Sequence, residues 1–195
     1  MSSELLRLAF QPSSGARSAT PAALPLLARL LETDPAGLSV VIGPSGKPRL
    51  DVPHHDLHFN LAHAGGLVVV AATTAGPVGV DLEPAGRDLT GSRLIRRFFT
   101  AGEQADVAAA PDPGRRALEI WTLKEALVKA EGVSIYQARR HLDLASVRLA
   151  SGQWTQTSTP FGPRWLRPLP CPRGFLGALA FQGSVPPEVR LGTAP

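Results

Sequence analysis

Two short segments carry charged side chains whose types and spacing could hold a divalent cation. In the first, Asp81 and Glu83 are two positions apart, so on a strand both carboxylates project from one face. In the second, Glu125 and Lys129 are four positions apart, so on a helix they share a face. Mg²⁺ is commonly bound by one or two carboxylates together with waters and phosphate oxygens. This pattern predicts a site in which Asp81, Glu83 and Glu125 surround the cation, with Lys129 beside it.

The first segment has the alternation of a strand. Residues 67–72 form a valine-rich apolar run, residues 73–77 contain a glycine–proline pair, and residues 78–83 alternate. We therefore expect a β-hairpin in which residues 78–83 form the second strand. Alternation places the two acids on one face of this strand and three apolar residues on the other: Val78, Val80 and Leu82.

The second segment has the pattern of a helix. Residues 118–131 contain no glycine or proline, and Gly132 is suited to end the helix. An apolar stripe should face the core, and it consists of Ile120, Leu123, Leu127 and Ala130. Each segment also has a simpler interpretation without a metal, as a strand end with solvated acids and as a helix with an ordinary Glu–Lys pair.

The use of lysine adds to the argument. The chain has 20 basic residues, of which only Lys47, Lys124 and Lys129 are lysines, so the others are all arginines. Because a compact ammonium and a planar guanidinium bind phosphate differently, the retained lysines indicate positions that require lysine. Two of them lie in the predicted helix, and the third lies in Gly46-Lys47-Pro48.

Together the two segments resemble the paired signature of the 4′-phosphopantetheinyl transferases. The signature is Gly79-Val80-Asp81-Leu82-Glu83 followed by Trp121-x-x-Lys124-Glu125-Ala126-x-x-Lys129-x-x-Gly132. Three further elements resemble those of the pseudo-dimeric branch, typified by the surfactin-synthetase-activating enzyme. They are Gly46-Lys47-Pro48, Phe59-Asn60-Leu61-Ala62-His63, and Arg97-Phe98-Phe99-Thr100 with Glu103. The order and approximate spacing of the five elements agree across residues 46–132.

The resemblance implies an enzyme that transfers the 4′-phosphopantetheine group of coenzyme A to a serine of an acyl or peptidyl carrier protein. The second product would be adenosine 3′,5′-bisphosphate. The resemblance also implies Mg²⁺ as the cofactor, bound by Asp81, Glu83 and Glu125. The implied catalytic residues are Glu125 as the base toward the serine, Lys129 on the pyrophosphate, and His63 on a phosphate of coenzyme A.

The resemblance assigns further residues to the binding of coenzyme A. His63 and Lys129 would contact its phosphates, and Lys47 and Arg49 would lie near its adenine end. Larger relatives have a longer N-terminal part with basic residues that reach the 3′-phosphate. Arg17 is the local candidate for that contact in this chain.

One departure from the family pattern leaves alternatives open. The family's serine before the histidine is Ala62 here, and alanine cannot donate the hydrogen bond that this hydroxyl gives to the nucleotide phosphate. A catalytically impaired relative that binds coenzyme A or a carrier protein is therefore an alternative. A third hypothesis is a Mg²⁺-dependent phosphohydrolase that uses the same acids with water as the nucleophile.

The order of the expected elements indicates an α+β fold. By resemblance it has two similar lobes, residues 1–75 and residues 76–195, with coenzyme A in the cleft and the metal-site motifs in the second lobe. Further helices are expected at residues 24–32, 92–99 and 102–110. Further strands are expected at residues 39–42, 57–61, 142–150, 153–157 and 177–181. We expect the tail after Gln182 to be loose.

Composition indicates the class of partner. With 44% hydrophobic residues the chain can bury a core, and a single cysteine, Cys171, excludes an internal disulfide and fits the cytoplasm. The net charge of +4 suits coenzyme A and an acidic carrier protein. We find no nucleic-acid motif, signal peptide or membrane-spanning run, and we expect a monomer without nucleic-acid or membrane partners. The histidine-rich residues 54–58 lack transition-metal spacing and are interpreted as a surface loop.

Overall fold

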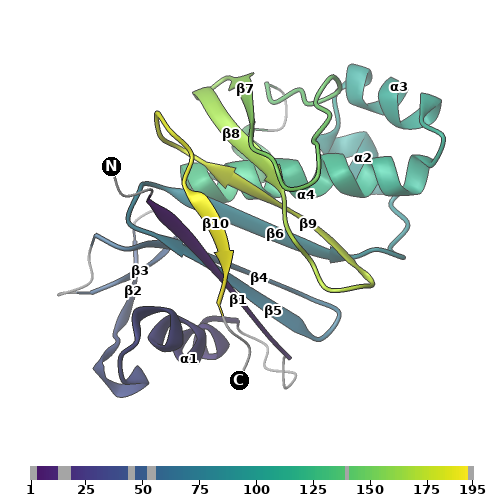
Figure 1. The fold of residues 1–195 in the computed structure, drawn as a ribbon. Helices are drawn as coiled ribbons and strands as arrows, with labels where there is room; N and C mark the ends of the chain where they lie inside the picture. Colours follow the sequence, from purple (N-terminus) through teal and green to yellow (C-terminus); the bar gives the residue numbers. More distant parts are fainter. Residues whose placement is uncertain (1–3, 13–18, 44–46, 52–55, 139–140, 193–195) are drawn as a thin grey trace.

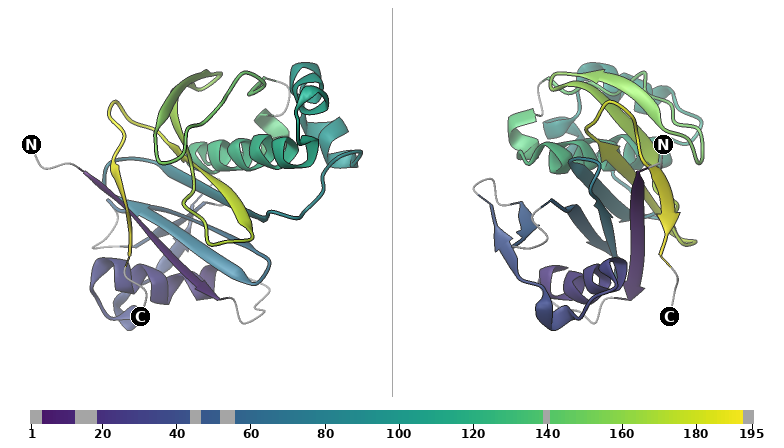
Figure 2. Two further views of the ribbon diagram at one scale, coloured as in Figure 1. Left: turned by 45° about the vertical axis from the view of Figure 1, so that its right-hand side comes forward. Right: turned by 60° about the vertical axis from the view of Figure 1, so that its left-hand side comes forward.

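The computed structural model of this chain describes residues 4–12, 19–43, 47–51, 56–138 and 141–192, arranged in four layers (Figures 1 and 2). A helix, two four-stranded sheets and a longer helix follow one another across the molecule. Separate clusters of buried apolar side chains fill the spaces between successive layers. The α+β class expected from the sequence is confirmed.

The first sheet has the strand order β10-β1-β5-β4, and α1 (Ala19–Leu31) covers its outer face. Its strands are β1 (Leu5–Pro12), β4 (His58–Ala64), β5 (Leu67–Thr73) and β10 (Glu188–Leu191). After α1 come the 3₁₀ helix η1 (Pro35–Gly37) and a two-stranded ribbon of β2 (Val40–Ile42) and β3 (Pro48–Leu50).

Strand β5 explains the valine-rich run in the sequence. Val68 and Val70 lie in the cluster that includes α1, whereas Val69 and Ala71 lie in the cluster between the two sheets. A strand that is buried on both faces reads as a continuous apolar run rather than as an alternating one. Strand β5 therefore has a neighbouring strand on each side and a buried apolar cluster on each face.

The second sheet has the order β6-β9-β8-β7 and is covered by α4. Its strands are β6 (Val78–Pro84), β7 (Thr155–Thr159), β8 (Gly162–Pro168) and β9 (Phe175–Phe181). The helices on its outer side are α2 (Arg93–Phe98), α3 (Ala101–Ala109), α4 (Pro113–Glu131) and the short α5 (Ile135–Ala138). All four residues of the predicted apolar stripe of α4 are buried. No helix in the described ranges is long and apolar enough to cross a membrane.

Helix α4 begins and ends at residues suited to those positions. The Asp112 side chain accepts a hydrogen bond from the Arg115 N–H, and Pro113 occupies the first turn, where its missing N–H costs nothing. Gly132 ends the helix in the left-handed conformation, with a φ of 69°. The helix therefore starts five residues before the predicted Leu118, because Pro113 and Gly114 belong to its first turn.

The predicted β-hairpin between residues 67–72 and 78–83 is wrong, although both strands exist. Strand β5 pairs with β1 and β4, whereas β6 pairs with β9 in the other sheet. The apolar face of β6 packs against the first sheet instead of continuing it, since Val78, Val80 and Leu82 lie in the cluster between the sheets. Residues between the two strands therefore cross from one layer to the next.

Two further expectations are wrong in the C-terminal third. Residues 142–150 form no strand; they are irregular, and the buried Arg116 guanidinium binds the carbonyl oxygens of Leu144, Ala145 and Val147. The Arg116 side chain thus donates the hydrogen bonds that a neighbouring strand would otherwise give to these carbonyls. The tail after Gln182 contains β10, which pairs with β1 in parallel. Strands β1, β3 and β8 were not expected from the sequence.

The division into lobes at residues 75 and 76 remains a proposal. Each of the two large sheets has its own helical cover, and the change of layer between β5 and β6 falls at this point of the chain. Strand β10 departs from the simple division, because it belongs to the first sheet. In a division into two lobes, the last strand of the second lobe therefore pairs in the sheet of the first lobe.

Strand β6 and helix α4 approach each other unusually closely at Gly79. A Cβ atom on Gly79 would lie 2.0 Å from the carbonyl oxygen of Ala126 and 2.5 Å from the backbone nitrogen of Ala130. Both are backbone atoms of a helix, so neither can move aside without moving α4. Glycine at this position therefore sets the distance between the two segments that carry the charged side chains.

Replacing Gly79 should separate the strand from the helix. We expect Gly79→Ala to lower the free energy of unfolding by about 3 kcal/mol, because overpacking against backbone has no flexible neighbour to absorb it. The matched control is Gly86→Ala, whose added Cβ would meet nothing within 4 Å. Its effect should stay within about 1 kcal/mol. Urea unfolding measures both, and equal effects of the two changes would contradict the close approach.

Candidate active site

Strand β6 presents its acids to helix α4. The Nζ atom of Lys129 lies 2.7 Å from Asp81 Oδ1, and Trp121 Nε1 donates to Glu83 Oε1 at 3.2 Å. Glu125 lies between Trp121 and Lys129 on the same face of α4, close enough for the acids of β6 to affect its ionisation. The structure thus brings four predicted residues together, and we call Asp81, Glu83, Glu125 and Lys129 the carboxylate cluster.

Asp81 is the most deeply buried acid of the cluster, with 7% of its surface exposed. Its Oδ1 atom is paired with Lys129, but its buried Oδ2 atom has no hydrogen-bond partner among the described residues. Burial raises the pKa of Asp81 to about 6, and the Lys129 ammonium opposes this rise only in part. A buried carboxylate oxygen without a donor is unfavourable, and a bound cation would satisfy it.

Glu83 is held from two sides. Arg87, in the turn after β6, and Trp121, on α4, both donate to its Oε1 atom. These donors fix the position of the carboxylate between the strand and the helix. Arg87 was not singled out from the sequence, because a spacing of four indicates an ion pair only on a helix, and Glu83 lies near the end of a strand.

Glu125 differs from the other two acids, because it has no hydrogen bond or ion pair to another described residue. It is half-buried, and burial raises its pKa to about 7, with the Asp81 carboxylate adding to the rise and Lys129 opposing it. The ionisation of Asp81 and Glu83 therefore affects that of Glu125, so the three acids are near neighbours.

The donor chemistry of the cluster fits Mg²⁺. In the described part of the chain, no group of three or more acidic, histidine or cysteine side chains is placed so that it could hold a metal ion. Mg²⁺ does not require such a group, since waters and phosphate oxygens usually complete its shell around one or two carboxylates. Asp81 Oδ2 and the unpaired Glu125 carboxylate are the oxygens most available for this purpose.

Strand β6 is an edge strand, and side chains from other segments bind its outward backbone groups. Lys47 Nζ donates to the carbonyl oxygens of Val78 at 3.2 Å and of Ala130 at 3.1 Å. Lys129 Nζ donates to the Val80 carbonyl at 3.2 Å, and the Val80 N–H donates to Asn60 Oδ1 at 3.0 Å. Burial lowers the pKa of Lys47 to about 8, against the opposing effect of Glu131. Two of the three lysines therefore bind one strand edge.

Of the residues predicted to bind coenzyme A, Lys129 belongs to the carboxylate cluster and Lys47 binds the same strand edge. His63 is exposed on β4, on the face whose other members, Phe59 and Leu61, pack toward α1. Arg49 is exposed on β3, and Arg17 lies outside the described residues. The contacts of these residues with a nucleotide, and that of Lys47, stay predictions.

The position of the missing family serine is now defined. Ala62 is buried, pairs with Val69, and lies in the apolar cluster between the two sheets. Its neighbour Asn60 lies on the same face and holds β6. In the histidine-rich segment, His54 and His55 lie outside the described residues, whereas His58 is the first residue of β4, so the predicted loop is wrong at that residue.

A buried ion pair that the sequence analysis did not identify supports the helix. Lys124 Nζ lies 2.9 Å from Glu103 Oε1, both side chains are fully buried, and Lys124 also donates to the Leu142 carbonyl. Glu103 closes the capping box of α3 with Thr100 and accepts a hydrogen bond from the Leu144 N–H. The Thr-x-x-Glu capping box was the available sequence signal. Lys124 is thus a structural residue of the signature.

Comparison with known proteins places this arrangement in a family. A family model described as the 4′-phosphopantetheinyl transferase superfamily matches residues 77–167, which include β6, α4 and the whole carboxylate cluster. The chain is 33% identical over 132 residues to the 4′-phosphopantetheinyl transferase AcpT of Salmonella typhi, a match that covers 67% of each protein. The chain belongs to the 4′-phosphopantetheinyl transferase superfamily.

Other relatives match over smaller shares of their length. AcpT of Escherichia coli K12 is 35% identical over 100 residues, 50% of this chain and 51% of the relative. The 4′-phosphopantetheinyl transferase Sfp of Bacillus subtilis is 29% identical over 127 residues, 64% of this chain and 53% of the relative. The chain thus spans about half the length of most curated relatives that it matches.

The raised pKa of Glu125 predicts a pH-dependent stability. Between the ordinary value of 4.5 and the folded-state value of about 7, the folded protein binds more protons at Glu125 than the unfolded chain does, so this group lowers stability as pH rises. Glu125→Gln should therefore stabilise the metal-free protein by about 1 to 3 kcal/mol at pH 8 and have little effect at pH 4.

Urea unfolding in EDTA at the two pH values measures this difference. The control is Glu188→Gln, because hydrogen bonding to Arg190 lowers the pKa of Glu188 and its replacement should not stabilise the protein at pH 8. A stabilisation by Glu125→Gln that is equal at pH 4 and pH 8 would contradict the raised pKa.

The two lysines of α4 should differ in their effect on stability. Lys124→Met leaves Glu103 as an unpaired buried charge, and we expect a loss of about 3 to 5 kcal/mol. Lys129→Met also removes the ion-pair partner of a buried acid, Asp81, but the Lys129 side chain is 28% exposed, so the loss should be smaller, about 1 to 2 kcal/mol. Thermal unfolding of both variants checks the order, and the reverse order would refute the structural role of Lys124.

Proposed function

We propose that the protein transfers the 4′-phosphopantetheine group from coenzyme A to a serine of an acyl or peptidyl carrier protein, and releases adenosine 3′,5′-bisphosphate. The observation that carries this proposal is the meeting of β6 and α4 at Gly79, which gathers three carboxylates and an ammonium at one place. Membership of the superfamily, and the names of the relatives, support the same reaction.

In this proposal Asp81, Glu83 and Glu125 hold Mg²⁺. When bound, the ion neutralises and polarises the pyrophosphate oxygens of coenzyme A. The Lys129 ammonium, 2.7 Å from Asp81 Oδ1, keeps a positive charge at the same place. Arg87 and Trp121 hold Glu83 in position through its Oε1 atom.

Glu125 is the proposed base. Phosphoryl transfer needs the serine hydroxyl to lose its proton as its oxygen attacks the phosphorus next to pantetheine, and the pyrophosphate bond then breaks toward the nucleotide. A base with a pKa near the working pH is best suited to accept that proton. In the metal-free protein burial raises the pKa of Glu125 to about 7, and no described residue forms a hydrogen bond with its oxygens.

The remaining predicted contacts complete the proposal. His63, Lys47, Arg49 and Arg17 would bind the nucleotide part of coenzyme A, in a cleft between the lobes of a pseudo-dimer. The net charge of +4 supports an acidic carrier protein as the partner. We also propose a cytoplasmic location, which the single cysteine supports.

The test is to incubate the protein with coenzyme A, Mg²⁺ and apo-carrier domains from fatty-acid, polyketide and peptide synthesis, and to weigh the carriers by mass spectrometry. A gain of one phosphopantetheine that EDTA abolishes is expected. Asp81→Ala and Glu125→Gln should each lower the initial rate by about 100-fold or more. The exposed Glu188→Gln is the control and should leave the rate unchanged.

The same assay distinguishes the alternatives. Binding of coenzyme A without a mass gain on any carrier would favour a catalytically impaired relative, and Ala62→Ser would then be the first reversion to examine. Metal-dependent release of adenosine 3′,5′-bisphosphate in the absence of a carrier would favour a phosphohydrolase. Full activity in both cluster variants would refute the proposed role of the carboxylates.

A further inference from the structure

One lysine side chain joins the two elements that carry the carboxylate cluster. Lys47, directly before β3, donates from Nζ to the Val78 carbonyl of β6 at 3.2 Å and to the Ala130 carbonyl of α4 at 3.1 Å. Val78 is next to Gly79, where the strand and the helix approach closely, and Ala130 is next to Lys129 of the cluster. Lys47 therefore holds the strand and the helix together at one end of the cluster.

Both of these carbonyls lie where regular structure supplies no partner. A helix leaves the carbonyls of its last turn without intrahelical N–H donors, and Ala130 lies in that turn. Val78 lies on the outward edge of β6, as does Val80, whose carbonyl binds Lys129. Because Val78 and Ala130 are both buried, removal of the Lys47 ammonium takes a hydrogen bond from two buried backbone groups at once.

The backbone of Lys47 is itself held by the ribbon of β2 and β3. Its carbonyl accepts a hydrogen bond from the Gly43 N–H at 3.0 Å, next to the pair of Ile42 with Pro48. Leu50, at the end of β3, is buried in the apolar cluster that includes α1. The Lys47 side chain thus reaches from a fixed backbone on the side of the first sheet to the strand and helix of the second.

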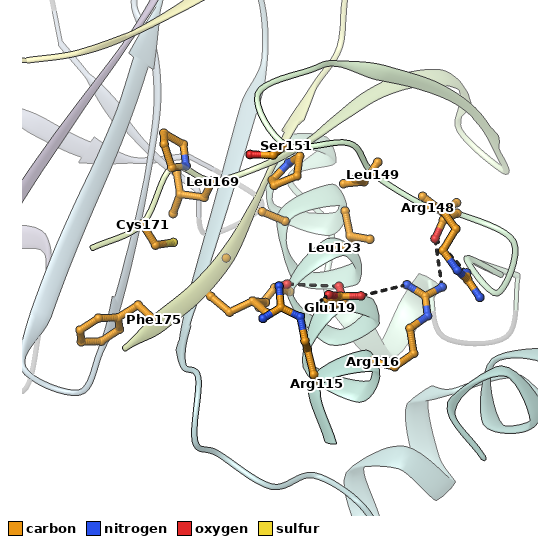
Figure 3. A pocket seen from close by; sticks show the side chains of 17 residues that line it. Arg115, Arg116, Glu119, Leu123, Arg148, Leu149, Ser151, Leu169, Cys171 and Phe175 are labelled. Atoms are coloured by element: carbon orange, nitrogen blue, oxygen red, sulfur yellow. Dashed lines mark hydrogen bonds and ion pairs between the residues drawn. The ribbon is translucent and has the colours of Figure 1, made fainter. Parts of the chain in front are cut away.

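The other polar anchors of α4 fix it to different parts of the fold. On its N-terminal half, Arg116 pairs with Glu119 beside a cavity of about 450 Å³ (Figure 3). At its C-terminal end, Glu131 accepts two hydrogen bonds from Arg164 of β8. Neither of these anchors contacts β6 by a hydrogen bond or ion pair among the described residues. Lys47 differs because it binds the backbones of both β6 and α4.

We propose that Lys47 is a positioning residue for the transfer reaction, which by binding β6 and α4 keeps Asp81 and Glu125 at the separation that the reaction needs. This inference rests on the proposed function. It is separate from the predicted contact of Lys47 with coenzyme A, because an ammonium has three donors and two of them are used here. A displacement of about 1 Å between reacting groups can lower a rate by about 100-fold.

The first test separates kcat from KM. Lys47→Met keeps the length of the side chain and removes its donors, so kcat at saturating coenzyme A should fall at least about tenfold. Lys47→Arg keeps N–H donors at a similar reach and should hold kcat within about threefold of the wild-type value. Should Lys47→Met not fold, Lys47→Gln takes its place, because its shorter side chain cannot reach both carbonyls. A raised KM for coenzyme A with an unchanged kcat would overturn the proposal.

Arg164→Met is the matched control. It removes a buried ion pair at the same end of α4 but no contact with β6, so it should lower stability and leave kcat within about threefold of wild type. Circular dichroism shows that each variant is folded at the assay temperature. An equal fall of kcat in Arg164→Met and Lys47→Met would show that any loosening of α4 has this effect, and would contradict a specific role of Lys47.

A second readout does not depend on activity. Trp121 Nε1 donates to Glu83, so its indole N–H signal in a ¹H–¹⁵N spectrum reports the separation of α4 and β6. Trp154 and Trp165 donate to backbone carbonyls elsewhere and serve as internal references. Lys47→Met should shift the Trp121 signal and leave the two references in place, and an unmoved Trp121 signal would refute the positioning role.

The two readouts also distinguish this inference from the proposed function. If the wild-type protein modifies no carrier, the proposed function fails, whereas the spectrum still shows whether Lys47 sets the geometry of the cluster. If the wild-type protein is active and Lys47→Met keeps both its kcat and its Trp121 signal, the proposed function stands and the inference fails.

Discussion

The structure depends on hydrogen bonds to the backbone groups of one strand at the edge of a sheet. Strand β6 is the edge of its sheet, and unpaired backbone groups at an edge are unfavourable when they are buried between layers. Lys47, Asn60 and Lys129 bind these groups from a ribbon, a strand of the other sheet and a helix. Side chains from three other segments thus take the place of a neighbouring strand at this edge.

The buried charged residues near this edge differ in how completely their hydrogen-bonding groups are paired. Glu103 with Lys124, and Arg116 with its carbonyl partners, are fully satisfied and fix α3, α4 and the irregular chain around them. Asp81 and Glu125 are not, and the raised pKa of each carboxyl reflects burial without enough compensation. Buried carboxyl groups with raised pKa values on rigid elements are typical of a functional site, where a bound ligand supplies the interactions that the fold does not.

Local patterns in the sequence predicted the elements that carry the site well and the partners of those elements badly. The spacing of Asp81 with Glu83, and of Glu125 with Lys129, defined faces that the structure brings together. The pairing of β6 with β9 could not be predicted in the same way. The strands on either side of Gly76, β5 and β6, are each apolar on at least one face, so a hairpin and a crossing between layers give the same sequence pattern. The irregular segment after residue 142 was mistaken for a strand, because the arginine that replaces its hydrogen-bond partners is distant in sequence. Ion pairs such as Glu103 with Lys124 depend on tertiary packing that no local pattern contains.

The parallel pairing of β1 with β10 has a consequence for how the molecule is made. The first and last described strands of the chain lie side by side, so their contact closes the longest loop that the fold contains. During synthesis, β1 can find β5 early, but its other edge stays open until residue 191 has left the ribosome. Contacts of such high sequence separation form slowly, and an open edge is where a nascent chain pairs with the wrong neighbour. During the interval between the two events, the free edge of β1 is open to pairing with a wrong strand.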